Sequence, residues 1–149
     1  MSFTKALFSG LVGAVAVNLL NEIARQFVQD APRLDILGKR AIAYPLMEVG
    51  KEPPPNSQLY WIALSGDIVT NSLYYSIVGL GDAKNAYRTG ALLGLAAGVG
   101  AVVLPERIGL GEEMTARANA TKAMTVAWYL AGGLAAAATY QALSDDLEN

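Results

Sequence analysis

The sequence contains no cysteine and no histidine. The absence of cysteine excludes disulfides, thiol catalysis, thiolate metal sites and iron–sulfur clusters. The absence of histidine removes the commonest general base and metal ligand, together with histidine ligation of haem. The net charge is −2, so no global basic field points to nucleic acid. We therefore expect no metal site, no cofactor and no nucleic-acid partner.

Charged side chains are also missing from long stretches of the chain. Residues 6–21, 89–105 and 123–144 carry no Asp, Glu, Lys or Arg, and residues 53–81 carry only Asp67. A membrane-spanning helix needs about 20 mostly apolar residues. The alternative is a water-soluble, alanine-rich bundle, but these stretches lack the charged stripe that a water-facing helix needs. The sequence thus predicts an all-α fold, an integral membrane four-helix bundle.

We expect a single transmembrane domain, residues 1–149, with helices at about 3–28, 57–80, 86–104 and 116–143. Proline is expected to stop the third helix at Pro105, and Thr115 is expected to cap the last one. In the first loop, residues 33–47 place apolar side chains at roughly helical spacing, with two basic residues on another side. This pattern predicts a short amphipathic segment at the membrane interface, which Pro45 would break early.

The run Leu59–Leu80 is apolar at both ends and polar in its middle, around Asp67. An isolated carboxylate near the bilayer midplane is costly, and is usually paired, protonated or functional. From helix depth at about 1.5 Å per residue, Asp67, Asn18 and Lys122 are expected to reach inward from the same side of the membrane. We predict an intramembrane polar cluster that comprises Asn18, Glu22, Asp67, Asn71 and Lys122.

Simpler interpretations of the same residues remain open. Asn18, Asn21, Glu22 and Arg25 share one helix face, and Glu22 with Arg25 can mark the membrane surface. Asp67 can equally serve as an internal ion pair or hydrogen-bond acceptor.

Glycine recurs at four-residue spacing in the third predicted helix, at Gly90, Gly94 and Gly98. We call these three residues the glycine seam. Glycine lets another helix backbone approach closely, which is how helices associate in lipid. The pattern predicts a packing surface, but leaves open whether the neighbour belongs to this chain or to a second copy.

Basic residues are distributed unevenly between the two sides of the predicted bundle. The two longer loops and their flanks hold Arg25, Arg33, Lys39, Arg40, Lys51, Arg107, Arg117 and Lys122, whereas the opposite side holds Lys5, Lys84 and Arg88. The positive-inside rule then puts both termini on the non-cytoplasmic side. The pattern of residues 88–138, RTGALLGLAAGVGAVVLPERIGLG followed by TKAMTVAWYLAGGLAAAA, resembles in texture small bacterial inner-membrane proteins. That resemblance implies a multi-pass protein of a bacterial inner membrane and supplies no functional motif.

Three functions are compatible with these residues. The first is an accessory or scaffold subunit, in a larger membrane complex or homo-oligomer, with no chemistry of its own. The second is an oligomeric channel or transporter for a cation or small solute, in which Asp67 binds or titrates. The third is a membrane enzyme acting on a lipid, isoprenoid or quinone, with Asp67 or Glu22 as acid or base. The sequence offers no catalytic motif for the third.

Overall fold

The computed structural model describes residues 2–145, and this part of the chain is 81% helical with no strand. Its long helices are α1 (Phe3–Phe27), α2 (Leu34–Glu48), α3 (Asn56–Tyr75), α4 (Ala86–Arg107) and α5 (Asn119–Asp145). Two short 3₁₀ segments, η1 (Ser76–Leu80) and η2 (Ala83–Asn85), form the turn between α3 and α4. The prediction of an all-α fold is confirmed.

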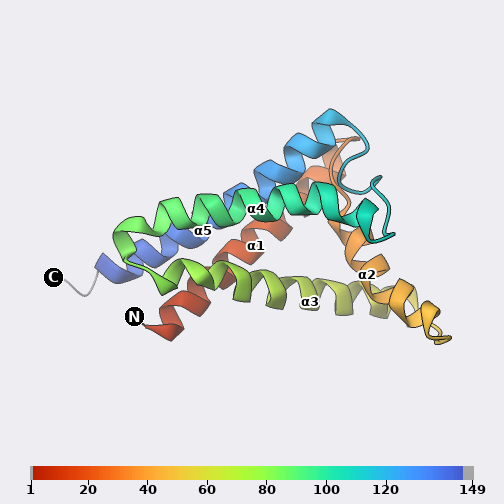
Figure 1. Cartoon of the computed structure of the whole chain (residues 1–149), viewed down its shortest axis with the longest axis horizontal. Helices are drawn as coiled ribbons and strands as arrows, with labels where there is room; N and C mark the ends of the chain where they lie inside the picture. Colours follow the sequence, from red (N-terminus) through yellow and green to blue (C-terminus); the bar gives the residue numbers. More distant parts are fainter. Residues whose placement is uncertain (1, 146–149) are drawn as a thin grey trace.

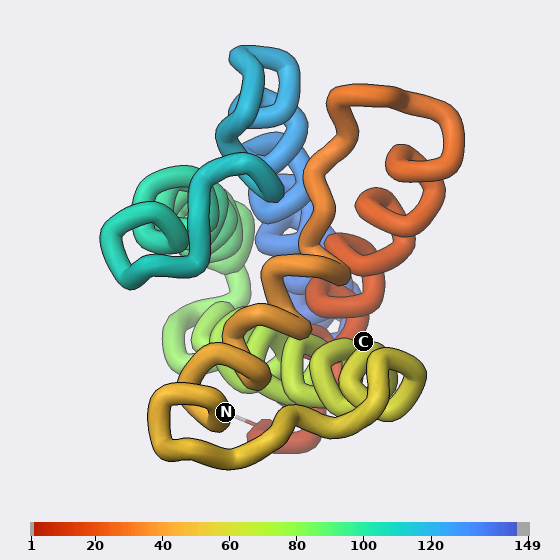
Figure 2. The backbone as a smooth tube through the Cα atoms, turned by 90° about the vertical axis from the view of Figure 1, so that its right-hand side faces the viewer, coloured from red at the N-terminus to blue at the C-terminus, as the bar shows by residue number. Residues whose placement is uncertain are grey.

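Four helices run lengthwise, and α2 crosses one end of them beside α3 (Figures 1 and 2). Helix α4 packs along α5, α5 along α1, and α1 along α3. Helices α3 and α4 touch little, and they diverge away from their shared turn (Figure 1). Near the N-terminus of α1, Lys5 donates a hydrogen bond to the Leu143 carbonyl. This contact places the start of α1 beside the end of α5. The bundle is therefore closed on three sides and open between α3 and α4.

Glycines set the closest helix contacts. A Cβ atom at Gly90 would lie 2.3 Å from the Gly133 carbonyl oxygen, and one at Gly94 would lie 2.6 Å from the Leu130 Cα. The structure thus places the glycine seam against α5 of the same chain. Helix α1 uses the same device, because a Cβ at Gly10 would lie 2.0 Å from the Ser72 carbonyl oxygen on α3.

Small residues fill the interior of the bundle, and large apolar residues lie outside. Ala14, Ala136 and Ala137 are fully buried, and Tyr75 and Val17 are among the few large side chains beside them. The exposed large side chains on the two most apolar helices include Phe8, Leu11, Leu19 and Ile23 on α1 and Leu92, Leu95, Val99 and Val103 on α4. This arrangement is the reverse of the usual one in water-soluble bundles.

Two helical stretches are long and apolar enough to cross a membrane, Phe3–Phe27 and Ala83–Arg107. The prediction of four spans is therefore not confirmed by length and composition. Helix α3 falls short because its middle carries polar residues, including Ser65, Asp67 and Asn71, and α5 because threonine, glycine, tyrosine and tryptophan lower its mean hydropathy. Alanine and glycine favour packing between helices but contribute little to transfer into lipid.

Several predicted boundaries differ from the observed ones. Pro45 and Pro105 both lie inside helices, in the last turns of α2 and α4, where the missing proline N–H removes only one hydrogen bond close to the end of the helix. The last helix begins at Asn119, so Thr115 does not cap it. Thr115 is instead buried, and its carbonyl oxygen accepts a hydrogen bond from the Thr125 hydroxyl at 3.0 Å.

Candidate functional site

The Asp67 carboxylate lies between two asparagine side chains. Asn18 Nδ2 on α1 donates to Asp67 Oδ2 at 2.8 Å, and Asn71 Nδ2, one turn further along α3, donates to Asp67 Oδ1 at 2.9 Å. The Asn18 amide also donates to the Ala14 carbonyl at 3.0 Å, which fixes its orientation. Each carboxylate oxygen thus has one amide donor, and these two hydrogen bonds offset part of the cost of burying the carboxylate.

Asp67 lines two cavities, one on each side of α3. The first cavity, of about 250 Å³, lies between α1, α2 and α3. The second, of about 530 Å³, lies in the opening between α3 and α4, and residues of α2 and Tyr129 of α5 also line it. Asn18 lines the first cavity and Asn71 the second. The carboxylate with its two amides therefore forms part of the wall that separates the two spaces.

The first cavity has a polar mouth. Its lining residues are Val15, Asn18, Leu19, Asn21, Glu22, Leu34, Asp35, Gly38, Tyr60, Ala63, Leu64, Asp67 and Ile68. Asn21 is only 4% exposed, and its Oδ1 has no hydrogen-bond partner among the described residues. A buried amide oxygen without a donor carries a desolvation penalty of about 1–3 kcal/mol. A bound group with an N–H or O–H would relieve that penalty.

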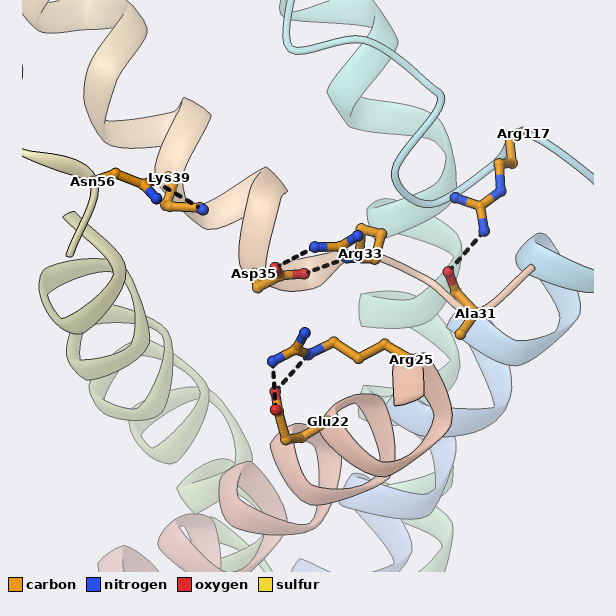
Figure 3. Close-up of polar contacts among 8 residues, drawn as sticks. All are labelled: Glu22, Arg25, Ala31, Arg33, Asp35, Lys39, Asn56 and Arg117. Carbon is orange, nitrogen blue, oxygen red and sulfur yellow. Dashed lines mark hydrogen bonds and ion pairs between the residues drawn. The ribbon is translucent and has the colours of Figure 1, made fainter. Parts of the chain in front are cut away.

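Two ion pairs border this mouth (Figure 3). Arg25 Nε donates to Glu22 Oε2 at 2.7 Å, and Arg33 donates to both oxygens of Asp35, at 2.9 and 2.8 Å. Burial disfavours the charged form of Asp35, but the hydrogen bonds and positive charge of Arg33 outweigh it and lower the pKa of the carboxyl. Both carboxylates at the mouth are therefore neutralised within their own pairs.

Asp67 differs from those two carboxylates because no lysine or arginine in residues 2–145 lies within ion-pairing distance of it. Lys122, the cation predicted for the polar cluster, is exposed on α5 and lines neither cavity. The structure differs from the prediction in the direction of the Lys122 side chain, which points away from the bundle. Lys122 lies only three residues into α5, and its neighbours Thr121 and Thr125 occupy the buried face of that helix.

Of the other predicted members, Asn18, Asp67 and Asn71 are brought together by direct hydrogen bonds. Glu22 lies in the same cavity wall but pairs with Arg25. Sequence reasoning left Asn21 and Asp35 out of the cluster. For Asn21 a signal was present, since it lies three residues after Asn18 on the same helix face. For Asp35 none was, because its place depends on how α2 folds back.

The site is a carboxylate with amide donors beside apolar space. Such a group can bind a proton or a cation and release it again. No group of three potential metal-ligating side chains occurs among the described residues. No family model, curated protein or solved structure matches this chain, so any function has to be argued from the site.

Proposed function

We propose that this chain is a four-span protein of a bacterial inner membrane that carries a monovalent cation by way of Asp67. The observation that supports this proposal is the position of Asp67 in the wall between two cavities, with one amide on each oxygen and no cationic partner among the described residues. A carboxylate that two separate spaces share is suited to accept a cation from one space and deliver it to the other.

The distribution of side chains supports placement in lipid. The outward faces of α1 and α4 carry large apolar residues along their length, while glycine and alanine hold the helices together inside. In water this surface would be an aggregation hazard, whereas lipid solvates it. Helices α3 and α5 would then cross the bilayer as partners of α1 and α4, with Asp67 and Asn71 of α3 half-buried and Thr125 of α5 fully buried in the bundle.

The depth of Asp67 along α3 and the distribution of basic residues support an orientation of the helices across the bilayer. Asp67 is eleven residues into α3, about 16 Å along its axis at 1.5 Å per residue. That distance is about half of a hydrocarbon core roughly 30 Å thick. The basic residues Arg33, Arg40 and Arg117 gather at the end formed by α2 and the α4–α5 loop, where Arg40 pairs with Glu113. Figure 3 shows Arg33 and the hydrogen bond from Arg117 to the Ala31 carbonyl at this end. The positive-inside rule assigns this end to the cytoplasm and both termini to the other side.

Cation flux in liposomes tests the proposal. Purified protein is reconstituted, and uptake of protons, sodium and potassium is followed by fluorescent indicators and that of an organic ammonium ion by radiolabel. We expect Asp67→Asn to abolish flux while the protein stays folded, and Asp67→Glu to retain part of it because the charge is kept. Asp82→Asn, which removes an exposed carboxylate near the α3–α4 turn, should leave flux unchanged. Equal flux in wild type and Asp67→Asn would refute the assignment.

A second candidate is an accessory subunit of a larger complex, or a homo-oligomer. It is favoured by the opening between α3 and α4, where the small residues Ala97, Gly100 and Ala101 line a space that no helix within residues 2–145 fills. A neighbouring helix could pack against them. Native mass analysis after mild extraction from the host separates the candidates, because a fixed stoichiometry with a larger protein would support the subunit. The glycine seam no longer supports docking, since α5 already occupies it.

A further inference from the structure

We infer that the cation taken up at Asp67 is a lipophilic ammonium-type ion, which enters sideways from the bilayer through the opening between α3 and α4. This inference rests on the proposed function and adds the chemical class of the substrate and its route. It follows from the charge, the shape and the surroundings of the second cavity.

The charge of the site limits the ligand to one positive charge. Asp67 is a single carboxylate, and the nearby Glu22 and Asp35 are each held by an arginine. A divalent ion needs several convergent oxygens and would leave excess positive charge in low dielectric. A monovalent cation instead forms a neutral pair with Asp67 without displacing either arginine.

The second cavity is too large and too apolar for a bare inorganic ion. Its volume of about 530 Å³ falls within the range of about 300–1,000 Å³ that is typical of sites for drug-sized ligands. The α4 wall consists of small and aliphatic residues, and the rings of Tyr74 and Tyr129 are the aromatic part of the lining. An apolar body would bury itself there by the hydrophobic effect, and its charged centre would reach Asp67 beside aromatic rings.

The opening faces the proposed lipid phase. Leu104 and Ile108, which line the second cavity at the end that carries α2, are 55% and 67% exposed, so large apolar side chains border the cavity at that end. At the other end, Tyr74 closes the space, because its hydroxyl donates to the Leu93 carbonyl of α4 at 2.9 Å. A molecule that partitions into the membrane therefore meets the entrance directly, whereas a hydrated ion does not.

The first cavity supplies an acceptor on the far side of Asp67. The Asn21 Oδ1 atom is buried there without a hydrogen-bond partner among the described residues. A protonated amine has an N–H that this oxygen can accept, while a quaternary ammonium or phosphonium does not. The geometry therefore favours protonated amines over fully substituted cations for passage from the second cavity to the first.

Direct binding tests the ligand class. Radiolabelled tetraphenylphosphonium and a lipophilic tertiary amine are titrated onto the purified protein in lipid nanodiscs by equilibrium dialysis. We expect both to bind wild type, and Asp67→Asn to weaken both by about tenfold or more, the equivalent of one charge-assisted contact. Asn21→Leu should weaken only the amine. Binding unchanged by Asp67→Asn would overturn the inference.

The route is tested by filling the opening. A Cβ at Gly100 meets nothing closer than Leu104 Cδ1 at 3.6 Å, so Gly100→Leu places a side chain in the second cavity without disturbing α5. Gly66→Leu is the matched control, because it adds the same side chain on α3 where nothing lies within 4 Å and outside both cavities. We expect Gly100→Leu to reduce affinity by about tenfold, and Gly66→Leu to bind as wild type. Equal affinities in the two variants would show that the ligand does not occupy the second cavity, and the proposed route through that cavity would then be wrong.

The two proposals fail in different ways. If protons, sodium or potassium cross the liposome membrane in an Asp67-dependent manner but neither organic cation binds, the proposed function stands and this inference is wrong. If the organic cations bind as expected but nothing is transported, the ligand site stands and the carrier function is wrong. Thermal unfolding of each variant shows that a loss of binding is not a loss of fold.

Discussion

Asn18 on α1 and Asp67 on α3 are joined by a hydrogen bond of 2.8 Å between the side-chain amide and the carboxylate. This contact ties the two helices at the level where the first cavity begins. It also supplies one of the two donors that compensate a partly buried carboxylate, and Asn71 supplies the other at 2.9 Å. The register between α1 and α3 and the hydrogen bonding of the Asp67 carboxylate therefore both depend on Asn18 and Asp67.

Removal of Asn18 should destabilise the protein through the carboxylate that it leaves behind. We expect Asn18→Leu to lower the free energy of unfolding by about 1–2 kcal/mol, since hydrogen bonds within membranes average below 1 kcal/mol and a stranded acceptor adds to the loss. Adding Asp67→Leu should cost less than the sum of the two single changes. The measurement is a double-mutant cycle in detergent, and strictly additive losses would show that the two side chains are not coupled.

Two glycines on α4 should respond in opposite ways to the same substitution. A Cβ at Gly94 would lie 2.6 Å from the Tyr129 carbonyl oxygen. Because that oxygen belongs to the backbone of α5, the clash can be relieved only if α4 and α5 move apart. We expect Gly94→Ala to cost about 1–3 kcal/mol, as overpacking does. Gly100→Ala is its control on the same helix and should be neutral or stabilising by up to about 1 kcal/mol, because alanine is the better helix former. Thermal unfolding in detergent measures both, and equal effects would contradict the assigned packing.

The Arg33–Asp35 pair should make stability depend on pH. Burial opposes the charge on Asp35, but Arg33 holds the pKa of the folded state below its ordinary value of 3.8. A carboxyl whose pKa is lowered on folding stabilises the protein above its unfolded pKa, and that stabilisation is lost as the pH falls through the folded pKa. We expect Asp35→Asn to unfold at a lower temperature than wild type near neutral pH, by about 2–4 °C if the pair contributes about 1 kcal/mol.

The difference between Asp35→Asn and wild type should then shrink as the pH is lowered below about 3.8. Asp82→Asn is a suitable comparison, because that carboxylate is exposed and lies 3.8 Å from Lys84. It should alter the unfolding temperature little. A constant difference between Asp35→Asn and wild type across the acid range would show that the pair does not provide the stabilisation.

The proposed orientation can be tested without removing any native thiol, because the sequence has no cysteine. We expect Lys84→Cys, at the α3–α4 turn, to react with a membrane-impermeant maleimide in intact spheroplasts. Glu113→Cys and Lys51→Cys, at the end that carries α2, should react only after the membrane is permeabilised. The reverse pattern would invert the topology, and labelling of all three in intact spheroplasts would argue against insertion across the membrane.

The sequence by itself determined the helical class, the approximate position of each helix and the prominence of Asp67. These follow from local rules, since long uncharged runs and glycine spacing are properties of neighbouring residues. It also placed Asn71 near Asp67, because residues four apart share a helix face. The sequence also showed that the middle of α3 is polar. That polarity keeps α3 from being apolar enough to count as a membrane span, which the prediction of four spans did not allow for.

Only the tertiary structure decided which faces meet. Depth along a helix is readable from residue number, but rotation about the helix axis is set by packing, so Lys122 was misplaced while Asn18 was not. The partner of the glycine seam, the return of Asp35 to the mouth of the first cavity, and the opening between α3 and α4 all depend on contacts between distant segments. No local pattern encodes such contacts, because each arises from the fit of two surfaces that the chain brings together on folding.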